Sequence, residues 1–116
     1  MRILVIESDP VTAELVEATF PGQYDVVVMT SGRAALERIA IGRPFDAVLC
    51  EVDPPDMTAR EFYARLDAGS PRTALRVIFL VNELKPNRAF LEKMGKRYVV
   101  RPVNSATLRD AFKMLP

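Results

Sequence analysis

The sequence contains no histidine and a single cysteine among its 116 residues. Without histidine, metal centres and general bases that depend on imidazole are excluded. The cysteine, Cys50, lies inside an apolar run and has no partner within the chain, so an internal disulfide is excluded and a reducing cytosol fits. We therefore expect Cys50 to be a buried structural thiol and the protein to be cytoplasmic.

Long hydrophobic runs and glycine-rich turns are also absent. No apolar run approaches the roughly 18 residues of a membrane span, and Arg2 leads directly into an expected strand, so we expect neither a membrane contact nor a signal peptide. A dinucleotide-binding enzyme would need a glycine-rich turn. A flavin-binding phosphate loop is disfavoured because the segment after the first strand, Glu7-Ser8-Asp9-Pro10, is acidic.

Charge is balanced overall but unevenly distributed. The chain has 16 basic and 15 acidic residues, yet residues 1–83 carry a net −5 and residues 84–116 a net +6. Such a dipolar domain could steer a charged partner, although a solvated basic face is the simpler interpretation. Nucleic-acid binding through the basic C-terminal third also stays open, because phosphate contacts need only clustered Lys and Arg.

Apolar stretches alternate with amphipathic ones along the chain, which predicts a single α/β domain spanning residues 1–116. Strands are expected at Arg2–Glu7, Tyr24–Met29, the run Ala47–Cys50 with Glu51, Leu75–Val81 and Tyr98–Val100. Helices are expected from Pro10 with Asp9 as its cap, after Ser31, after Thr58, around Asn87–Met94, and after a cap at Asn104 or Ser105. Gly69-Ser70-Pro71 is interpreted as the end of the third helix.

The segment Phe45–Asp56 organises the rest of the chain. Its apolar run predicts a strand buried on both faces, and Glu51 follows that run directly. In an open parallel sheet, binding and chemistry take place beyond the carboxyl ends of the strands. We therefore expect Glu51 to meet Glu7 and Arg101 at one edge of the sheet.

Several segments, taken together in this order and spacing, resemble the receiver domain of bacterial two-component response regulators over nearly the whole chain. They are Ile3–Pro10, Ser31–Leu36, Asp46–Glu51, Pro54–Met57 and Tyr98–Val103. The resemblance implies a flavodoxin-like three-layer fold with five parallel strands in the order 2-1-3-4-5, flanked by five helices. It also implies a signalling role, in which a histidine kinase donates a phosphoryl group to an aspartate, with magnesium. The resemblance further implies a cis Arg101–Pro102 bond.

The functional positions of that family are changed in this sequence. The acid pair after the first strand falls on Glu7 and Ser8, and the phosphoacceptor aspartate falls on Glu51. The hydroxyl residue after strand four falls on Val81, the lysine before proline on Arg101, and the glycine of the third helix on Ala59. Only the aromatic switch position, Tyr98, and Pro102 fit unchanged. The stretch from Val81 to Arg101 is about two residues short, which predicts a shortened fourth helix.

Each change has a chemical consequence. Glutamate adds one methylene to the acceptor, and reacting geometry tolerates such a displacement poorly. Ser8 removes a charge from the magnesium ligands, for which the nearby Asp9 and Asp53 could compensate, although Asp9 is equally needed as a helix cap. The planar fork of Arg101 suits a carboxylate, so we expect it to pair with Glu51, without a metal or other cofactor.

The sequence thus predicts a phosphorylation-independent pseudo-receiver, a non-enzymatic module for protein–protein interaction in signalling. Three alternatives remain: an ion-pair cluster that only holds the sheet end together, a receiver that is still phosphorylated in a phosphorelay with Asp53 as the near acceptor, and a nucleic-acid-contacting domain. An effector domain after Pro116 also stays open.

The expected interaction face comprises strand four, the short helix after it, strand five and the last helix. Its charged and aromatic residues are Lys85, Arg88, Lys93, Lys96, Arg97, Tyr98, Arg109 and Lys113. We expect this face to bind a protein partner, an effector domain or a second copy of the chain.

Overall fold

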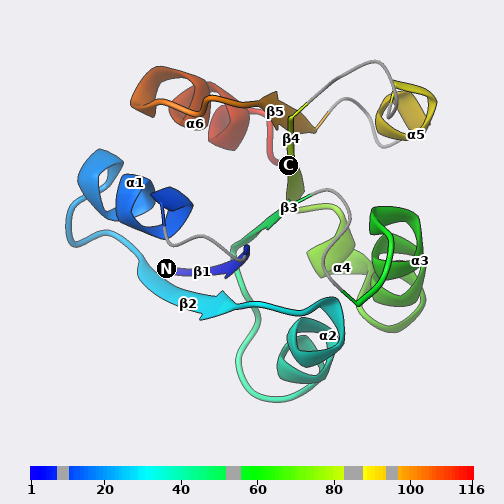
Figure 1. Ribbon diagram of the computed structural model, residues 1–116. Helices are drawn as coiled ribbons and strands as arrows, with labels where there is room; N and C mark the ends of the chain where they lie inside the picture. The colour runs from blue at the N-terminus through cyan, green and yellow to red at the C-terminus, as the bar shows by residue number, and fades with distance from the viewer. Residues whose placement is uncertain (8–10, 52–55, 83–87, 94–96) are drawn as a thin grey trace.

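Five parallel strands form one sheet in the order β2-β1-β3-β4-β5, in a computed structural model of the chain (Figure 1). The structure describes residues 1–7, 11–51, 56–82, 88–93 and 97–116. The strands are β1 (Arg2–Ile6), β2 (Asp25–Met29), β3 (Ala47–Glu51), β4 (Val77–Val81) and β5 (Tyr98–Val100). The predicted fold class and strand order are confirmed.

Helices cover both faces of the sheet, six of them within the described ranges. They are α1 (Val11–Thr19), α2 (Gly32–Ala40), α3 (Ala59–Gly69), α4 (Pro71–Ala74), α5 (Arg88–Lys93) and α6 (Ser105–Lys113). α1 and α6 lie on one face, and α2 to α5 lie on the other (Figure 1). None of these helices has the length and apolar content needed to cross a membrane.

The central strands are buried on both faces, and their alternation divides the core in two. Ile3, Leu49 and Ile78 pack with α1 and α6, whereas Leu4, Val48 and Phe79 pack with the helices of the opposite face. β1, β3 and β4 therefore read as continuous apolar runs, as expected for parallel strands covered on both sides.

Polar caps fix where three helices begin. The side chain of Ser31 accepts a hydrogen bond from the N–H of Ala34, and Thr58 accepts one from Glu61. Asn104, one of the two predicted candidates, forms a reciprocal capping box with Thr107. These bonds satisfy backbone donors that the first helical turn leaves without an intrahelical acceptor.

The structure corrects the predicted helix count of five. The segment Gly69-Ser70-Pro71 ends α3 as predicted, but Pro71 is also the first residue of a further helix, α4. Proline suits a first helical position because its missing N–H has no acceptor there and its φ is already helical. Leu75 then caps α4, so β4 begins at Val77 rather than at Leu75.

Two other predictions concern the C-terminal half. The Arg101–Pro102 peptide bond is cis, as expected. The short helix predicted around Asn87–Met94 is α5, whose described residues are Arg88–Lys93.

Candidate functional site

Glu7 and Glu51 lie on adjacent strands at the carboxyl edge of the sheet. Ile6 of β1 is the register partner of Cys50 of β3. Glu7 and Glu51 are the next residues along the two strands, so they lie opposite one another at the strand ends. Neighbouring strands are about 4.8 Å apart. The N–H of Glu7 donates to the carbonyl of Met29 (3.1 Å), which continues the pairing with β2 beyond the end of β1. The pairing of β1 with β3 thus places the backbones of Glu7 and Glu51 side by side.

Arg101 pairs with Glu7 at this edge. Its Nη1 lies 3.0 Å from Oε1 of Glu7, whose side chain is 1% exposed, against 28% for Arg101. Neither carboxylate oxygen accepts a directed hydrogen bond from a described residue, so the contact depends on charge attraction. The backbone N–H of Arg101 donates to the carbonyl of Val81 (2.7 Å), which anchors the arginine beside β4.

We predicted that Arg101 would pair with Glu51, and the structure shows a contact of its guanidinium with Glu7. The carboxylate of Glu7 is almost fully removed from water, whereas Glu51 is half-buried. A buried anion needs a nearby cation far more than a partly solvated one does. A contact of Arg101 with Glu51 stays a prediction.

Of the other predicted site residues, the structure describes three and leaves three outside the described ranges. Val81 is fully buried in the core on the side of α2 to α5, and Tyr98 is half-buried against the same core. Pro102 follows the ion-paired arginine and is exposed. Ser8, Asp9 and Asp53 lie outside the described residues.

A cavity of about 450 Å³ opens beside the ion pair. Glu7, Arg101 and Asn82 contribute polar groups to its wall, and α1 contributes Val11, Thr12 and Leu15. The site therefore combines an ion pair, whose carboxylate is buried, with a helix face made by Val11, Thr12 and Leu15.

The described residues do not fit a magnesium ion. Magnesium prefers several oxygen ligands in octahedral geometry, and no group of three or more possible metal-ligating side chains gathers in the described ranges. The guanidinium of Arg101 already contacts Glu7, so a metal ion there would add a second cation to the same carboxylate.

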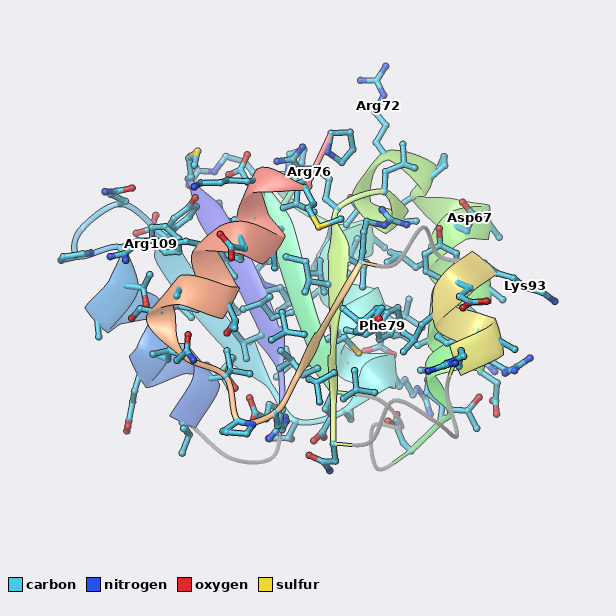
Figure 2. All side chains as sticks on the ribbon, turned by 90° about the horizontal axis from the view of Figure 1, so that it is seen from above. Asp67, Arg72, Arg76, Phe79, Lys93 and Arg109 are labelled. Carbon is cyan, nitrogen blue, oxygen red and sulfur yellow. The ribbon has the colours of Figure 1, made fainter. Side chains whose placement is uncertain are left out.

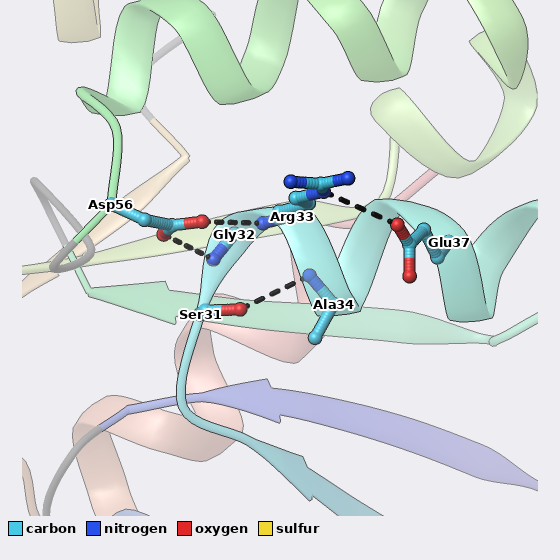
Figure 3. A network of polar contacts seen from close by, with 6 residues as sticks. All are labelled: Ser31, Gly32, Arg33, Ala34, Glu37 and Asp56. Carbon is cyan, nitrogen blue, oxygen red and sulfur yellow. Dashed lines mark hydrogen bonds and ion pairs between the residues drawn. The ribbon is translucent and has the colours of Figure 1, made fainter.

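Sequence reasoning missed the role of Asp56, which holds the loop after β3 against α2 (Figure 3). Its two carboxylate oxygens accept the backbone N–H groups of Gly32 (2.7 Å) and Arg33 (2.9 Å). These hydrogen bonds, that of Arg33 first, lower the pKa of Asp56 below its usual value. An acid preceding a predicted helix was visible in the sequence, but its bonding to a different helix was not.

Gly32 and Met57 make a second contact between this loop and α2. A Cβ at position 32 would lie 2.8 Å from Sδ of Met57, so only glycine lets the thioether pack this closely without a shift. Asp56 and Met57 thus hold the chain just before α3 against α2 at two adjacent points.

The expected interaction face is seen in Figure 2, with α6 and α5 on either side of β5. Lys93 and Arg109 extend to opposite sides of the view. Arg97 is half-buried and donates to the carbonyl of Ala74 (3.2 Å) and the hydroxyl of Tyr63 (3.4 Å). Of the remaining predicted residues, Arg88 and Lys113 are exposed, and Lys85 and Lys96 lie outside the described residues.

A shallow hollow of about 300 Å³ lies on this face between β5 and α6. Its wall includes Tyr98, the exposed Val100 and the exposed Met114. Tyr98 therefore lies beside apolar side chains that are open to solvent.

No protein-family model and no curated protein matches the chain. Solved structures do match. The chemotaxis response regulator CheY4 of Vibrio cholerae is 24% identical, with a TM-score of 0.81 over 99% of this chain and 98% of that chain. A response regulator from Chloroflexus aurantiacus is 24% identical, with a TM-score of 0.77 over 98% and 96% of the two chains.

A third similar structure contains a metal. The receiver domain of a sensor histidine kinase from Pseudomonas aeruginosa, with magnesium in its active-site cleft, is 23% identical, with a TM-score of 0.74 over 98% of this chain and 95% of that chain. In each comparison the similarity extends over nearly the full length of both chains. The chain therefore has the fold of response regulator receiver domains.

Proposed function

We propose that this domain is a phosphorylation-independent pseudo-receiver, a non-enzymatic module that binds a protein partner in signalling. The contact of Arg101 with the buried Glu7, 3.0 Å between Nη1 and Oε1, carries the proposal. It places a permanent cation on a carboxylate that, in a magnesium-dependent receiver, would be needed for the metal.

The residue at the acceptor position supports the same function. Glu51 ends β3, one methylene longer than the aspartate that accepts a phosphoryl group in receivers. Val81 at the end of β4 is fully buried and offers no hydroxyl to a phosphoryl oxygen. Acceptor, metal ligands and hydroxyl group have thus changed together, and Glu51 supplies a permanent negative charge at the acceptor position.

The proposed partner surface is the face formed by α5, β5 and α6, and the proposed location is the cytoplasm. Tyr98 would anchor the contact, and Lys93, Arg109 and Lys113 would surround it. Peripheral charges of this kind raise association rates, whereas a buried aromatic slows dissociation. A second copy of the chain or an attached effector domain would use the same surface.

The first prediction tests phosphorylation. Incubation with acetyl phosphate and magnesium should leave the intact mass of the wild-type chain unchanged, because both the acceptor geometry and the metal site are altered. A variant with Glu51→Asp, Val81→Thr and Arg101→Lys serves as the matched comparison. Both chains should unfold cooperatively in urea, which shows that the compared proteins are folded.

A stoichiometric gain of one phosphoryl group by the wild-type chain would contradict the proposal. Peptide mapping would then distinguish Glu51 from Asp53 as the acceptor, and the domain would be a phosphorylatable receiver. Gain of a phosphoryl group by the triple variant alone would show that the three substitutions are sufficient to block the chemistry.

A further inference from the structure

The outer edge of β2 is an open sheet edge made largely of apolar residues. β2 (Asp25–Met29) lies at the end of the strand order and pairs with β1 on one side. Figure 1 shows it as the outermost strand, with α1 and α2 on opposite faces of the sheet beside it. Val28 is 45% exposed, and Val26, Val27 and Met29 are half-buried. The strand therefore has hydrocarbon side chains available on a side where no second strand covers it.

The backbone of β2 presents hydrogen-bonding groups along this edge. The N–H of Asp25 donates to the carbonyl of Met1 (2.7 Å), and the carbonyl of Met29 accepts an N–H from the end of β1 (3.1 Å). Asp25 and Met29 thus turn their polar groups toward β1, and along a paired strand such residues alternate with residues that turn the other way. Val26 and Val28 therefore direct their N–H and C=O groups outward. Within the described ranges, no turn or loop backbone group bonds to them.

The two edges of the sheet differ in how they are protected against another strand. Natural proteins commonly blunt an exposed edge with proline, lysine, a bulge or a very short strand. β5 has such features, since it contains three residues and is followed by Arg101 and Pro102. β2 has five residues in unbroken register with β1, contains neither proline nor lysine, and carries a single charge, at Asp25. Of the two edges, β2 is therefore the one that can accept a further strand.

The sequence of β2 is complementary to itself in one antiparallel register. When Val27 lies opposite Val27 of a second copy, Val26 of each copy can exchange both backbone hydrogen bonds with Val28 of the other. A shift of two residues in either direction would leave only one of the three valines opposite a valine, and a shift of one would set outward groups against inward ones. Asp25 lies opposite Met29 in this register, so the two carboxylates are at opposite ends of the paired segment and do not face each other.

The same register covers the exposed side chain. Val26 packs in the core on the side of α1 and α6, whereas Val27 and Met29 pack in the opposite core, so by alternation Val28 is on the α1 side. Facing residues of an antiparallel pair point to the same side of the sheet. The exposed Val28 of one copy therefore packs beside Val26 of the other. A two-fold axis perpendicular to the sheet relates the copies, which closes the assembly at a dimer.

We propose that the outer edge of β2 binds the same edge of a second copy of the chain. The contact is an antiparallel pair of β2 strands centred on Val27, and it joins two five-stranded sheets into one continuous sheet. The inference stands apart from the proposed function, because β2 and β5 are at opposite edges of the sheet and pairing at β2 needs no loss of phosphorylation.

The test uses the whole 116-residue chain with Tyr98→Ala, so that association through β5 does not contribute. Sedimentation velocity over a range of concentrations should show a dimer. Addition of Val28→Pro removes an outward N–H that β1 does not use, and should weaken the dimer about tenfold or more, as expected for a hydrogen bond lost in each copy. Addition of Val28→Thr keeps the N–H and the β-branched shape, so this control should still dimerise. Urea unfolding of each variant shows whether it is folded.

A disulfide experiment tests the register. Val27→Cys should form an interchain disulfide under mild oxidation, because facing residues of a non-hydrogen-bonded pair have Cα atoms about 4.5 Å apart, within reach of a disulfide. Val26→Cys is the matched control on the same strand, since it faces Val28 of the other copy and has no thiol opposite. The natural Cys50 is fully buried and should not cross-link. This experiment keeps the proposal testable even where Val28→Pro unfolds the domain.

Three results would overturn the inference. They are a folded Tyr98→Ala chain that is monomeric at every concentration, unchanged association after addition of a folded Val28→Pro, and equal cross-linking of Val26→Cys and Val27→Cys. None of these results bears on the pseudo-receiver proposal, which the phosphorylation experiment decides. Phosphorylation of the wild-type chain would in turn leave the contact between β2 strands standing.

Discussion

Of the two ion pairs compared here, the one between Glu7 and Arg101 is expected to change the free energy of unfolding more when it is broken. A carboxylate that is 1% exposed pays a desolvation cost of several kcal/mol unless a cation compensates it. The exposed pair Arg33–Glu37, with 80% and 70% exposed side chains, pays almost none and gains correspondingly little. The chain thus provides an internal comparison between a buried and an exposed ion pair.

The second prediction uses this comparison. Arg101→Met should lower the free energy of unfolding by an amount near the lower end of the roughly 3–5 kcal/mol typical of a broken buried pair, since Arg101 is 28% exposed. Arg33→Met, which breaks the exposed pair, should cost about 0.5 kcal/mol or less. Urea unfolding followed by circular dichroism measures both. Equal costs for the two substitutions would show that Glu7 does not depend on its arginine.

The third prediction concerns Asp56 and acid stability. Hydrogen bonds from Arg33 and Gly32 lower the pKa of Asp56 in the folded state, so the folded chain holds this proton less tightly than the unfolded chain. The stabilisation is therefore complete above the unfolded pKa, about 4, and is lost as the pH falls through the lower, folded value. Asp56→Ala should lower the melting temperature at neutral pH and should flatten its dependence on pH below about 4.

Asp67→Ala is the matched control for Asp56, because it removes an exposed aspartate from the nearby α3. Thermal unfolding at several pH values should show the flattened acid limb for Asp56→Ala alone. If both alanine variants kept the acid dependence of the wild-type chain, the hydrogen bonds of Asp56 with Gly32 and Arg33 would contribute nothing to stability.

At the scale of whole elements, an aromatic cluster joins α1, β2 and α6 on one face of the sheet. The rings of Phe20 and Phe112 are stacked, with centroids 5.1 Å apart and 14° between planes, and Tyr24 packs edge-on against both. These residues lie at the end of α1, before β2 and near the end of α6. The cluster therefore holds the C-terminal helix against the N-terminal half of the chain.

The fourth prediction is that Phe20 and Phe112 are energetically coupled. A double-mutant cycle with alanine at both positions should give a coupling free energy of about 0.5–1.5 kcal/mol, as measured for other aromatic pairs. The control cycle combines Phe20→Ala with Phe90→Ala, since Phe90 packs in the core on the opposite face of the sheet. That cycle should be additive within about 0.5 kcal/mol. Coupling of equal size in both cycles would mean that the two cores are not independent.

At the scale of the whole molecule, charge divides the chain between an acidic N-terminal part and a basic C-terminal part. The fold brings the basic part to the β5 side, where α5 and α6 flank the last strand (Figure 1). The hollow beside Tyr98 is lined by Val100 and Met114 and also by the polar side chains of Thr107 and Asp110. This arrangement suits a partner that is recognised by charge at a distance and by hydrocarbon contact at the centre.

The fifth prediction is that the chain self-associates through this face. Sedimentation velocity over a range of concentrations should show a dimer that Tyr98→Ala weakens at every salt concentration. Lys93→Glu with Arg109→Glu should change association mainly at low salt, because charges beyond roughly 8 Å are screened near physiological ionic strength.

Arg72→Glu is the control for this experiment, because Arg72 is exposed on α4 and points away from β5 (Figure 2). It should leave the sedimentation profile unchanged. A wild-type chain that is monomeric at every concentration would contradict the homodimer, and equal effects of Arg72→Glu and Tyr98→Ala would place the contact on another surface.

Much of the fold was determined by the sequence alone, because its signals are local. Short apolar runs, typical of strands buried on both faces, predicted the strands of the sheet. Side chains such as Ser31 and Thr58 predicted helix starts, because each bonds a residue only three positions away. The strand order and the cis bond at Pro102 came from the family resemblance. The meeting of Glu7 and Arg101 followed from the rule that strand ends converge at one edge.

Only the tertiary structure decided which charges pair and which surfaces remain open. The near-complete burial of the Glu7 carboxylate beside Arg101 depends on packing, which no sequence pattern records. Asp56 binds a helix 24 positions earlier in the chain, and Arg97, predicted for the interaction face, donates hydrogen bonds to Ala74 and Tyr63. Such contacts join distant segments, so packing, and not local propensity, determines them.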